Sequence, residues 1–133
     1  MRKIALILGI CSTVLLSGCI TTTHQIDVGE AEFVEPKAFS KPAGELDGKV
    51  TILRDSGLLS AIVKSYVSVN EIPVAELSPS QKTVIYLPEG KHFFSLKQGV
   101  TESYETINLH PKDEAVLRIH ADVYNGIGIS QIK

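Results

Sequence analysis

Apolar and polar residues alternate with a period of two along most of the chain beyond Gly48. Apolar runs of five to eight residues are separated by turn residues, a pattern typical of short β-strands. No run is long and periodic enough to predict a helix, and only residues 57–63 are candidates for a single helical turn. The predicted strands cover residues 49–54, 61–69, 74–77, 82–87, 92–96, 104–109, 115–123 and 126–132.

Residues 115–123 alternate most cleanly, which predicts a strand with one face toward a core and one toward water. The inward side chains are expected to be Leu117, Ile119, Ala121 and Val123, and the outward ones Val116, Arg118, His120 and Asp122. In residues 61–69, the face with Val63, Val67 and Val69 is expected to lie opposite the face with Ile62, Lys64, Tyr66 and Ser68.

Turn residues predict how these strands connect. Asn70-Glu71 suits a hairpin turn, and Pro73 fits only near a strand start or on an edge strand. Pro88-Glu89-Gly90 and residues 110–113 are each expected to close a hairpin between the strands that flank them. Gly126 and Gly128 indicate a bulge or a close backbone approach in the last strand.

Eight short strands cannot remain one open sheet with both faces in water, because the apolar face needs a partner. The expected fold is therefore all-β: a small antiparallel β-sandwich of immunoglobulin-like type over residues 48–133. Asp55-Ser56-Gly57 is expected to be an ordinary turn after the first strand.

The chain starts with Arg2 and Lys3, a 13-residue apolar stretch over residues 4–16, and the tetrapeptide Leu16-Ser17-Gly18-Cys19. The apolar stretch is shorter than the about 20 residues that cross a bilayer, and it matches the core of a signal peptide. The tetrapeptide resembles a bacterial lipobox, in which Leu16, Ser17 and Gly18 are recognised by the signal peptidase. The resemblance implies removal of residues 1–18, a diacylglycerol on the Cys19 thiol and acylation of the new amino terminus.

A lipid-bearing terminus makes the mature protein membrane-tethered. Several acyl chains hold a protein far more firmly than one chain does. Ile20, in place of an aspartate, resembles the sorting signal for the outer membrane. We therefore expect a lipid-anchored protein of the bacterial cell envelope, on the outer membrane and facing the periplasm.

Residues 19–47 are expected to form a lipidated tether, because acidic residues and Pro36 and Pro42 interrupt any sustained period. Residues 20–47, if flexible, would reach about 30 Å from the bilayer. Phe33, Val34 and Phe39 complicate this expectation. They either dock on the body as an extra edge strand, which we favour, or mark a partner-binding segment.

The positions of the cysteines and the net charge exclude several kinds of site and partner. Cys11 lies in the segment expected to be removed and Cys19 carries lipid, so the mature body has no thiol for a disulfide, a metal or a nucleophile. Without Arg2 and Lys3, 11 basic residues face 15 acidic ones, a net charge of −4. This charge argues against nucleic acid as a partner.

Three segments carry a resemblance to a known class of domain: residues 48–54, residues 67–70 leading to 74–77, and residues 86–92 with their Pro88-x-Gly90-x-His92 pattern. They resemble small bacterial lipoprotein domains of unknown function that share a PEGA-like core, although Lys91 stands where the PEGA tetrapeptide has alanine. The resemblance spans residues 46–132. It implies a sandwich fold and an envelope location, and it brings no catalytic residue.

Residue patterns for catalysis and metal binding are absent from the sequence. His24, His92, His110 and His120 form no closely spaced ligand pair, and no serine lies in a GxSxG elbow. We expect His92 to bond to the backbone of its own turn. Arg118, His120 and Asp122 share a strand face and could form a polar patch or weak metal site, but a solvated face is favoured. No catalytic residue, metal or cofactor is assigned.

The sequence favours a non-enzymatic function. The preferred hypothesis is an envelope lipoprotein whose sandwich presents an edge strand or loop to an envelope protein or to peptidoglycan. The alternative is a module that binds a small ligand or glycan by stacking on Tyr66, Tyr86, Tyr104 or Tyr124. A hydrolase with dispersed acidic residues is the least favoured.

Overall fold

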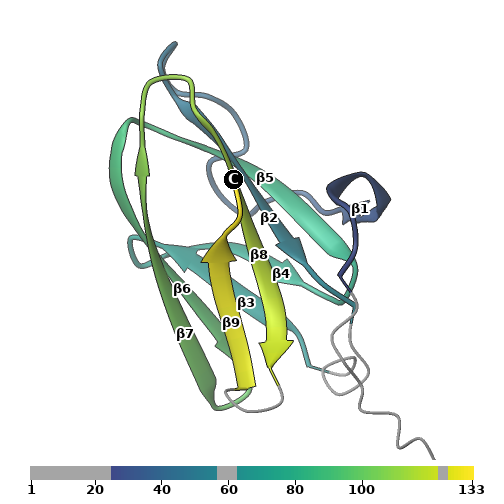
Figure 1. The fold of residues 1–133 in the computed structure, drawn as a ribbon. Coiled ribbons are helices and arrows are strands. Elements are labelled where there is room, and N and C mark those ends of the chain that lie inside the picture. The colour runs from purple at the N-terminus through teal and green to yellow at the C-terminus, as the bar shows by residue number, and fades with distance from the viewer. Residues whose placement is uncertain (1–24, 57–62, 123–125) are drawn as a thin grey trace, which may run out of the picture.

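The structure is a computed structural model that describes residues 25–56, 63–122 and 126–133 (Figure 1). Strands dominate these residues and pack as two sheets, which confirms the all-β sandwich. Among the described residues, no helix is long and apolar enough to cross a membrane. The elements are η1 (Val28–Glu30), β1 (Glu32–Phe33), β2 (Gly48–Arg54), β3 (Ser65–Val69), β4 (Ile72–Leu77), β5 (Gln81–Leu87), β6 (Gly90–Gln98), β7 (Thr101–Leu109), β8 (Glu114–Asp122) and β9 (Gly126–Gln131).

Several expectations fall on residues that the structure does not describe. These are the signal peptide, the lipobox with Cys19, and most of the candidate helical turn at residues 57–63. Val123 also lies outside the described residues, and the side chains of Ala121 and Asp122 are not described.

The two sheets have the strand orders β1-β5-β2-β8-β9 and β4-β3-β6-β7. All pairs in the second sheet are antiparallel, whereas the first contains two parallel pairs, β1 with β5 and β2 with β8. Figure 1 shows the sheets facing each other, with β6 and β7 on the left and β2 and β5 on the right.

The core fills the space between the sheets. Strands such as β5 and β6 contribute alternate side chains, and the inward positions of β8 confirm the predicted face with Leu117 and Ile119. Burying such side chains is the main source of stability in a body without disulfides. The largest core side chains with no more than 2% exposure are Val50, Ile52, Leu77, Ile85, Leu87, Phe94, Leu96, Ile107, Leu117 and Ile119.

Two predicted hairpins are wrong. The turn at Pro88-Glu89 leads from β5 in one sheet to β6 in the other, and residues 110–113 lead from β7 back to β8 across the sandwich. The second turn is bound to β2 rather than to β7, since Lys49 N donates to Asp113 O at 2.8 Å. Proline and glycine mark a chain reversal, but the local sequence does not decide which sheet receives the next strand.

Other turns behave as predicted or add to the prediction. Asn70 and Glu71 both have positive φ, 47° and 70°, as a two-residue hairpin between β3 and β4 requires. Pro73 lies in β4, an edge strand, as expected. Gly99, with φ 60°, forms an unpredicted hairpin between β6 and β7. The strand expected over residues 61–69 begins only at Ser65.

The expected tether is largely part of the folded body. Residues 26–39, here called the strap, run along the edge of β5. Glu32 N donates to Ser80 O, just before β5, at 2.9 Å, and Val34 N donates to Lys82 O in β5 at 2.8 Å. The strap then reaches β4, where Lys37 N donates to Val74 O at 2.9 Å. Because it binds an edge of each sheet, the strap closes one side of the sandwich.

Side-chain packing against the core also holds the strap in place. Val34, Ala38 and Phe39 pack against the core, whereas Phe33 is half exposed. The hypothesis that this segment docks as an extra edge strand is thus confirmed for β1. The expected flexible reach is wrong for residues 26–39, because the amides of Glu32, Val34 and Lys37 bond to backbone carbonyls of the body rather than to water.

Candidate partner-binding face

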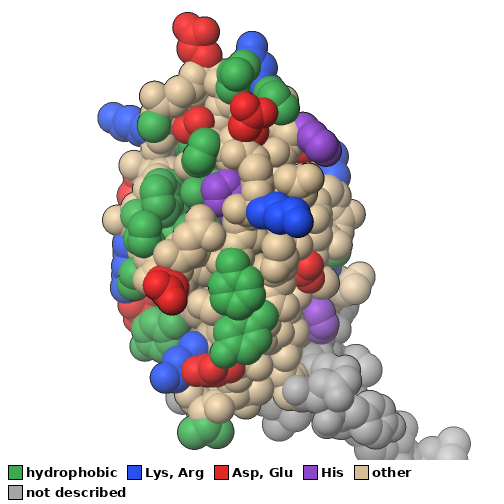
Figure 2. Space-filling view, turned by 90° about the vertical axis from the view of Figure 1, so that its left-hand side faces the viewer, with side chains coloured by type: hydrophobic (Ala, Val, Ile, Leu, Met, Phe, Trp, Pro, Cys, Tyr) green, Lys and Arg blue, Asp and Glu red, His purple; other side chains and the backbone are tan. Residues whose placement is uncertain are grey.

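The outer face of the sheet β4-β3-β6-β7 is open to solvent. We call it the open face and define it by the outward side chains of β3, β6 and β7. Figure 2 views the molecule from the side of β6 and β7, where hydrophobic side chains gather among charged ones of both signs. The open face consists of Tyr66, Ser68, Lys91, Phe93, Ser95, Lys97, Glu102, Tyr104, Thr106 and Asn108.

Three aromatic rings lie on the open face, each about half exposed: Tyr66 at 48%, Phe93 at 46% and Tyr104 at 54%. Phe93 and Tyr104 are diagonal neighbours on β6 and β7, since Ser95 is the register partner of Tyr104. Their rings stack with centroids 5.5 Å apart and an interplanar angle of 19°. Such a pair stabilises the sheet by about 0.5–1.5 kcal/mol and leaves ring surface available to a partner.

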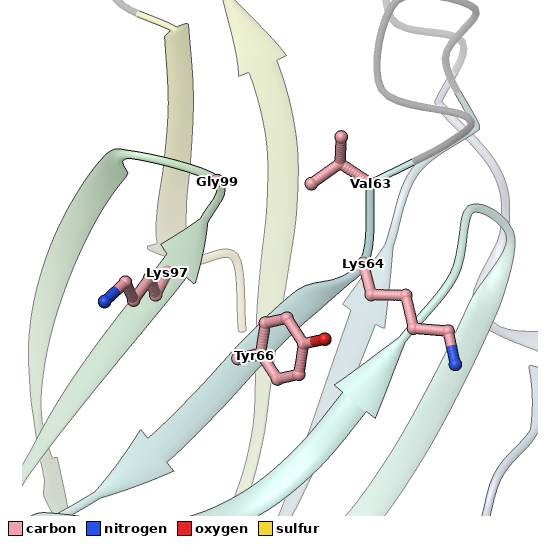
Figure 3. Close-up of a pocket in the computed structure, with 5 residues that line it drawn as sticks. All are labelled: Val63, Lys64, Tyr66, Lys97 and Gly99. Carbon is pink, nitrogen blue, oxygen red and sulfur yellow. The ribbon is translucent and has the colours of Figure 1, made fainter.

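A pocket of about 530 Å³ lies at the end of the open face near the β6–β7 hairpin. Its lining residues are Val63, Lys64, Tyr66, Lys97 and Gly99. Figure 3 shows the Tyr66 ring between the two lysines, whose ammonium groups point to opposite sides of it. No carboxylate belongs to this set of lining residues.

Charges around the pocket are unequally paired. Glu76 accepts from both Lys64, at 3.0 Å, and Lys37, at 3.1 Å, and these two lysines lower the pKa of its carboxyl. Lys97 has Glu102 as its register partner, but Glu102 Oε2 accepts a 2.6 Å hydrogen bond from the Tyr104 hydroxyl. That bond raises the pKa of Tyr104. Within the described ranges, Lys97 makes no ion pair.

The other outer face, on the sheet β1-β5-β2-β8-β9, is partly covered by the strap. Lys82 Nζ donates to Val28 O at 2.6 Å, and Arg118 Nη2 donates to Ile26 O at 3.4 Å. Lys82 and Arg118 are the two register partners of Leu53, so the strap crosses the row that contains this side chain. Leu53 is completely buried although it lies outside the main core.

Arg118 does not point freely toward water, and that prediction is wrong. Its Nη1 donates to Asp55 Oδ1 at 3.0 Å, and its side chain is 15% exposed. Asp55 is buried rather than part of an exposed turn, and its Oδ1 also accepts from Ile26 N at 3.4 Å. The ion pair therefore fastens the start of the strap to β2 and β8.

His120 lies against the backbone of Gly128, so that a Cβ on this glycine would be only 2.6 Å from His120 Nε2. This confirms the close backbone approach predicted for the last strand. A pocket of about 380 Å³ lies here, lined by Gln25, Arg118, His120, Ser130 and Ile132. In the described part of the chain, no group of three His, Cys, Asp or Glu side chains could hold a metal ion.

His92 has the structural role that the sequence predicted. It is buried, and its Nε2 lies 2.7 Å from Pro88 O. Its Nδ1 lies 3.0 Å from Asn70 Nδ2, which can only donate, so Nδ1 accepts and Nε2–H donates. Asn70 Oδ1 also accepts from Phe93 N at 3.0 Å. The imidazole thus joins two turns.

The structure brings only part of the predicted stacking set together. Tyr66 and Tyr104 lie on the open face, Tyr86 is half-buried on the other sheet, and Tyr124 is outside the described residues. Sequence reasoning missed Phe93 and Lys97. Their outward position could have been found from the alternation of residues 92–98, in which every second side chain is buried.

The chain matches no protein-family model and no curated protein. Arguments about its function therefore rest on its residues and their geometry.

Proposed function

We propose that this chain is a lipid-anchored lipoprotein of the bacterial cell envelope, on the outer membrane and facing the periplasm, with a non-catalytic sandwich that binds an envelope partner. The anchor would be a diacylglycerol on Cys19, after cleavage behind Leu16, Ser17 and Gly18. The lipobox-like sequence and the likeness of residues 46–132 to PEGA-like lipoprotein domains support this proposal.

The main support for a binding role is that the strap covers the edge strands on one side of the sandwich, whereas the open face remains exposed to solvent. The strap bonds to β5 and to β4, the edges on one side of the sandwich. A partner would therefore meet the open face, where three half-exposed rings lie among polar side chains, rather than an edge strand on that side. Exposed aromatic rings with polar neighbours are typical of surfaces that bind proteins or glycans.

Anchoring is tested by Cys19→Ala in the producing bacterium. Mass spectrometry of the purified protein should show an acylated Cys19 as first residue in the wild type and an unprocessed chain in the variant. Membrane fractionation should place the wild type with the outer membrane. An unmodified wild-type chain that starts at Met1 would overturn the proposed anchor.

Partner binding is tested by photocrosslinking in cells from two exposed strand positions. Thr106 lies on the open face, and Glu114 lies on β8 of the other sheet as a matched control. A crosslinked species is expected from a photoreactive residue at 106 and not from one at 114. Equal products from both positions, or none from 106, would contradict the proposed face.

A further inference from the structure

We propose that the partner of the open face is an acidic glycan strand, bound with a sugar on the Tyr66 ring and a carboxylate at the Lys97 ammonium. This inference rests on the proposed function and names its partner class. Cell-wall polymers whose sugars or attached peptides carry carboxylates belong to this class.

Stacking geometry favours a sugar over Tyr66. The ring is half exposed within the pocket, and Figure 3 shows it between Lys64 and Lys97. The apolar face of a pyranose packs on such a ring, while its hydroxyls remain free for hydrogen bonds. The pocket volume of about 530 Å³ lies in the range of small-ligand sites.

Charge favours an acidic sugar over a neutral one. Figure 3 shows Lys64 and Lys97 on opposite sides of the Tyr66 ring with their ammonium groups directed away from it, so a sugar stacked on the ring would have a lysine side chain on either side. Lys64 is already paired with Glu76. Lys97 is different: it makes no ion pair among the described residues, and one oxygen of Glu102, its register partner, accepts the Tyr104 hydroxyl. A ligand carboxylate would supply an ion-pair partner for Lys97, which forms no ion pair among the described residues.

The rest of the open face can extend the contact. Phe93 and Tyr104 lie on the strands that carry Lys97 and its neighbour Glu102, so a polymer could run from the pocket onto the ring stack. Ser95 and Thr106 add hydroxyl groups beside these rings. A small ligand would occupy the pocket alone, whereas a glycan polymer would contact both the pocket and the stacked rings of Phe93 and Tyr104.

The test uses the full chain, solubilised in detergent, with two probes of equal length: an oligogalacturonate and the neutral oligogalactoside. Calorimetry should show tighter binding of the acidic probe, weakened by added salt. Lys97→Met keeps the apolar stem and should weaken acidic binding about fivefold, the scale of a half-exposed ion pair, without changing neutral binding. Lys41→Met, at an exposed lysine outside the open face, should change neither.

One further variant tests the contribution of the Tyr66 ring. Tyr66→Leu should weaken both probes, because it removes the stacking surface and keeps a side chain of similar size. Equal affinity for both probes, or equal effects of Lys41→Met and Lys97→Met, would overturn the inference. If neither probe binds while residue 106 still crosslinks to an envelope protein, the glycan inference fails and the proposed function stands.

Discussion

The two outer faces of this sandwich differ in what covers them. On one sheet, the strap crosses the row of Leu53 and is held there by Arg118, Asp55 and Lys82. On the other sheet, the outward side chains remain in solvent, and three of them are half-exposed aromatic rings. The strand pattern reflects this: β2 is buried at almost every position, whereas β6 alternates.

Under the proposed function, this difference would separate attachment from recognition. The strap leads toward Cys19, so the covered face is the one joined to the expected anchor. Only residues 20–24 lie between Cys19 and the first described residue, Gln25, and an extended chain spans at most about 3.5 Å per residue. The body would therefore stay close to the bilayer, with its open face free to meet a partner.

The largest expected contrast is between the adjacent residues Phe94 and Phe93. Phe94→Ala should lower the free energy of unfolding by about 4 kcal/mol, because it removes a completely buried ring from the core. Phe93→Ala removes only a half-exposed ring and its stack with Tyr104, a loss of about 1 kcal/mol. Urea unfolding of both variants measures the difference. Similar losses would show that the two faces of β6 are not distinct.

Next in size is the ion pair below the strap. Arg118→Ala leaves the buried Asp55 carboxylate without its cation and should cost about 3 kcal/mol. Limited proteolysis should then cut the strap faster than in the wild type. Lys91→Ala, an exposed control on the open face, should change stability by less than about 0.5 kcal/mol. An unchanged strap in Arg118→Ala would mean that the ion pair does not hold it.

A smaller effect is expected at Thr83, which is completely buried in β5. Its Oγ1 donates to Val34 O of the strap at 2.7 Å. Thr83→Val keeps the shape but loses this hydrogen bond, so the unfolding free energy should fall by about 1 kcal/mol. Equilibrium denaturation checks the value, and no change at all would indicate that the strap is held by packing alone.

The smallest effect concerns protonation on the open face. Glu102→Gln removes the negative acceptor that raises the pKa of Tyr104, so this pKa should fall toward its ordinary value. In the wild type, the stabilisation from this bond is present below the ordinary phenol pKa and is lost as the pH rises through the raised one. Ultraviolet titration of the phenolate, with Tyr104→Phe as reference, measures the shift. A pKa that stays raised in Glu102→Gln would disprove the assigned cause.

Strand positions could be predicted from the sequence because alternation is local. The inward face of β8, the Asn70-Glu71 hairpin and the bond from His92 to its own turn all depend on neighbouring residues. Partners of strands are not local. The residues of the turn at Pro88 predict a hairpin, but β5 and β6 lie in different sheets. The sequence near β2 gives no signal for its parallel pairing with β8.

The strap and its ion pair could not be predicted from the sequence, because both depend on contacts between residues far apart in the chain. Residues 26–39 have no sustained period, because they bond to the backbones of β5 and β4 rather than forming a sheet of their own. Arg118 occupies an outward position, and its partner Asp55 is 63 residues away in sequence. For the candidate site, the tyrosines could be proposed from their residue type alone. That Lys97 makes no ion pair among the described residues depends on the orientation of the Glu102 carboxylate, which the sequence does not give.

Hydrogen exchange of the strap amides tests the central claim most directly, because a folded strap and a flexible tether differ there by orders of magnitude. The amides of Val34 and Lys37 bond to carbonyls of β5 and β4, and that of Glu32 bonds to Ser80 O just before β5. They should exchange as slowly as those in the middle of β5, since they open only with the body. Exchange of all three at the rate of an unstructured peptide would contradict the account.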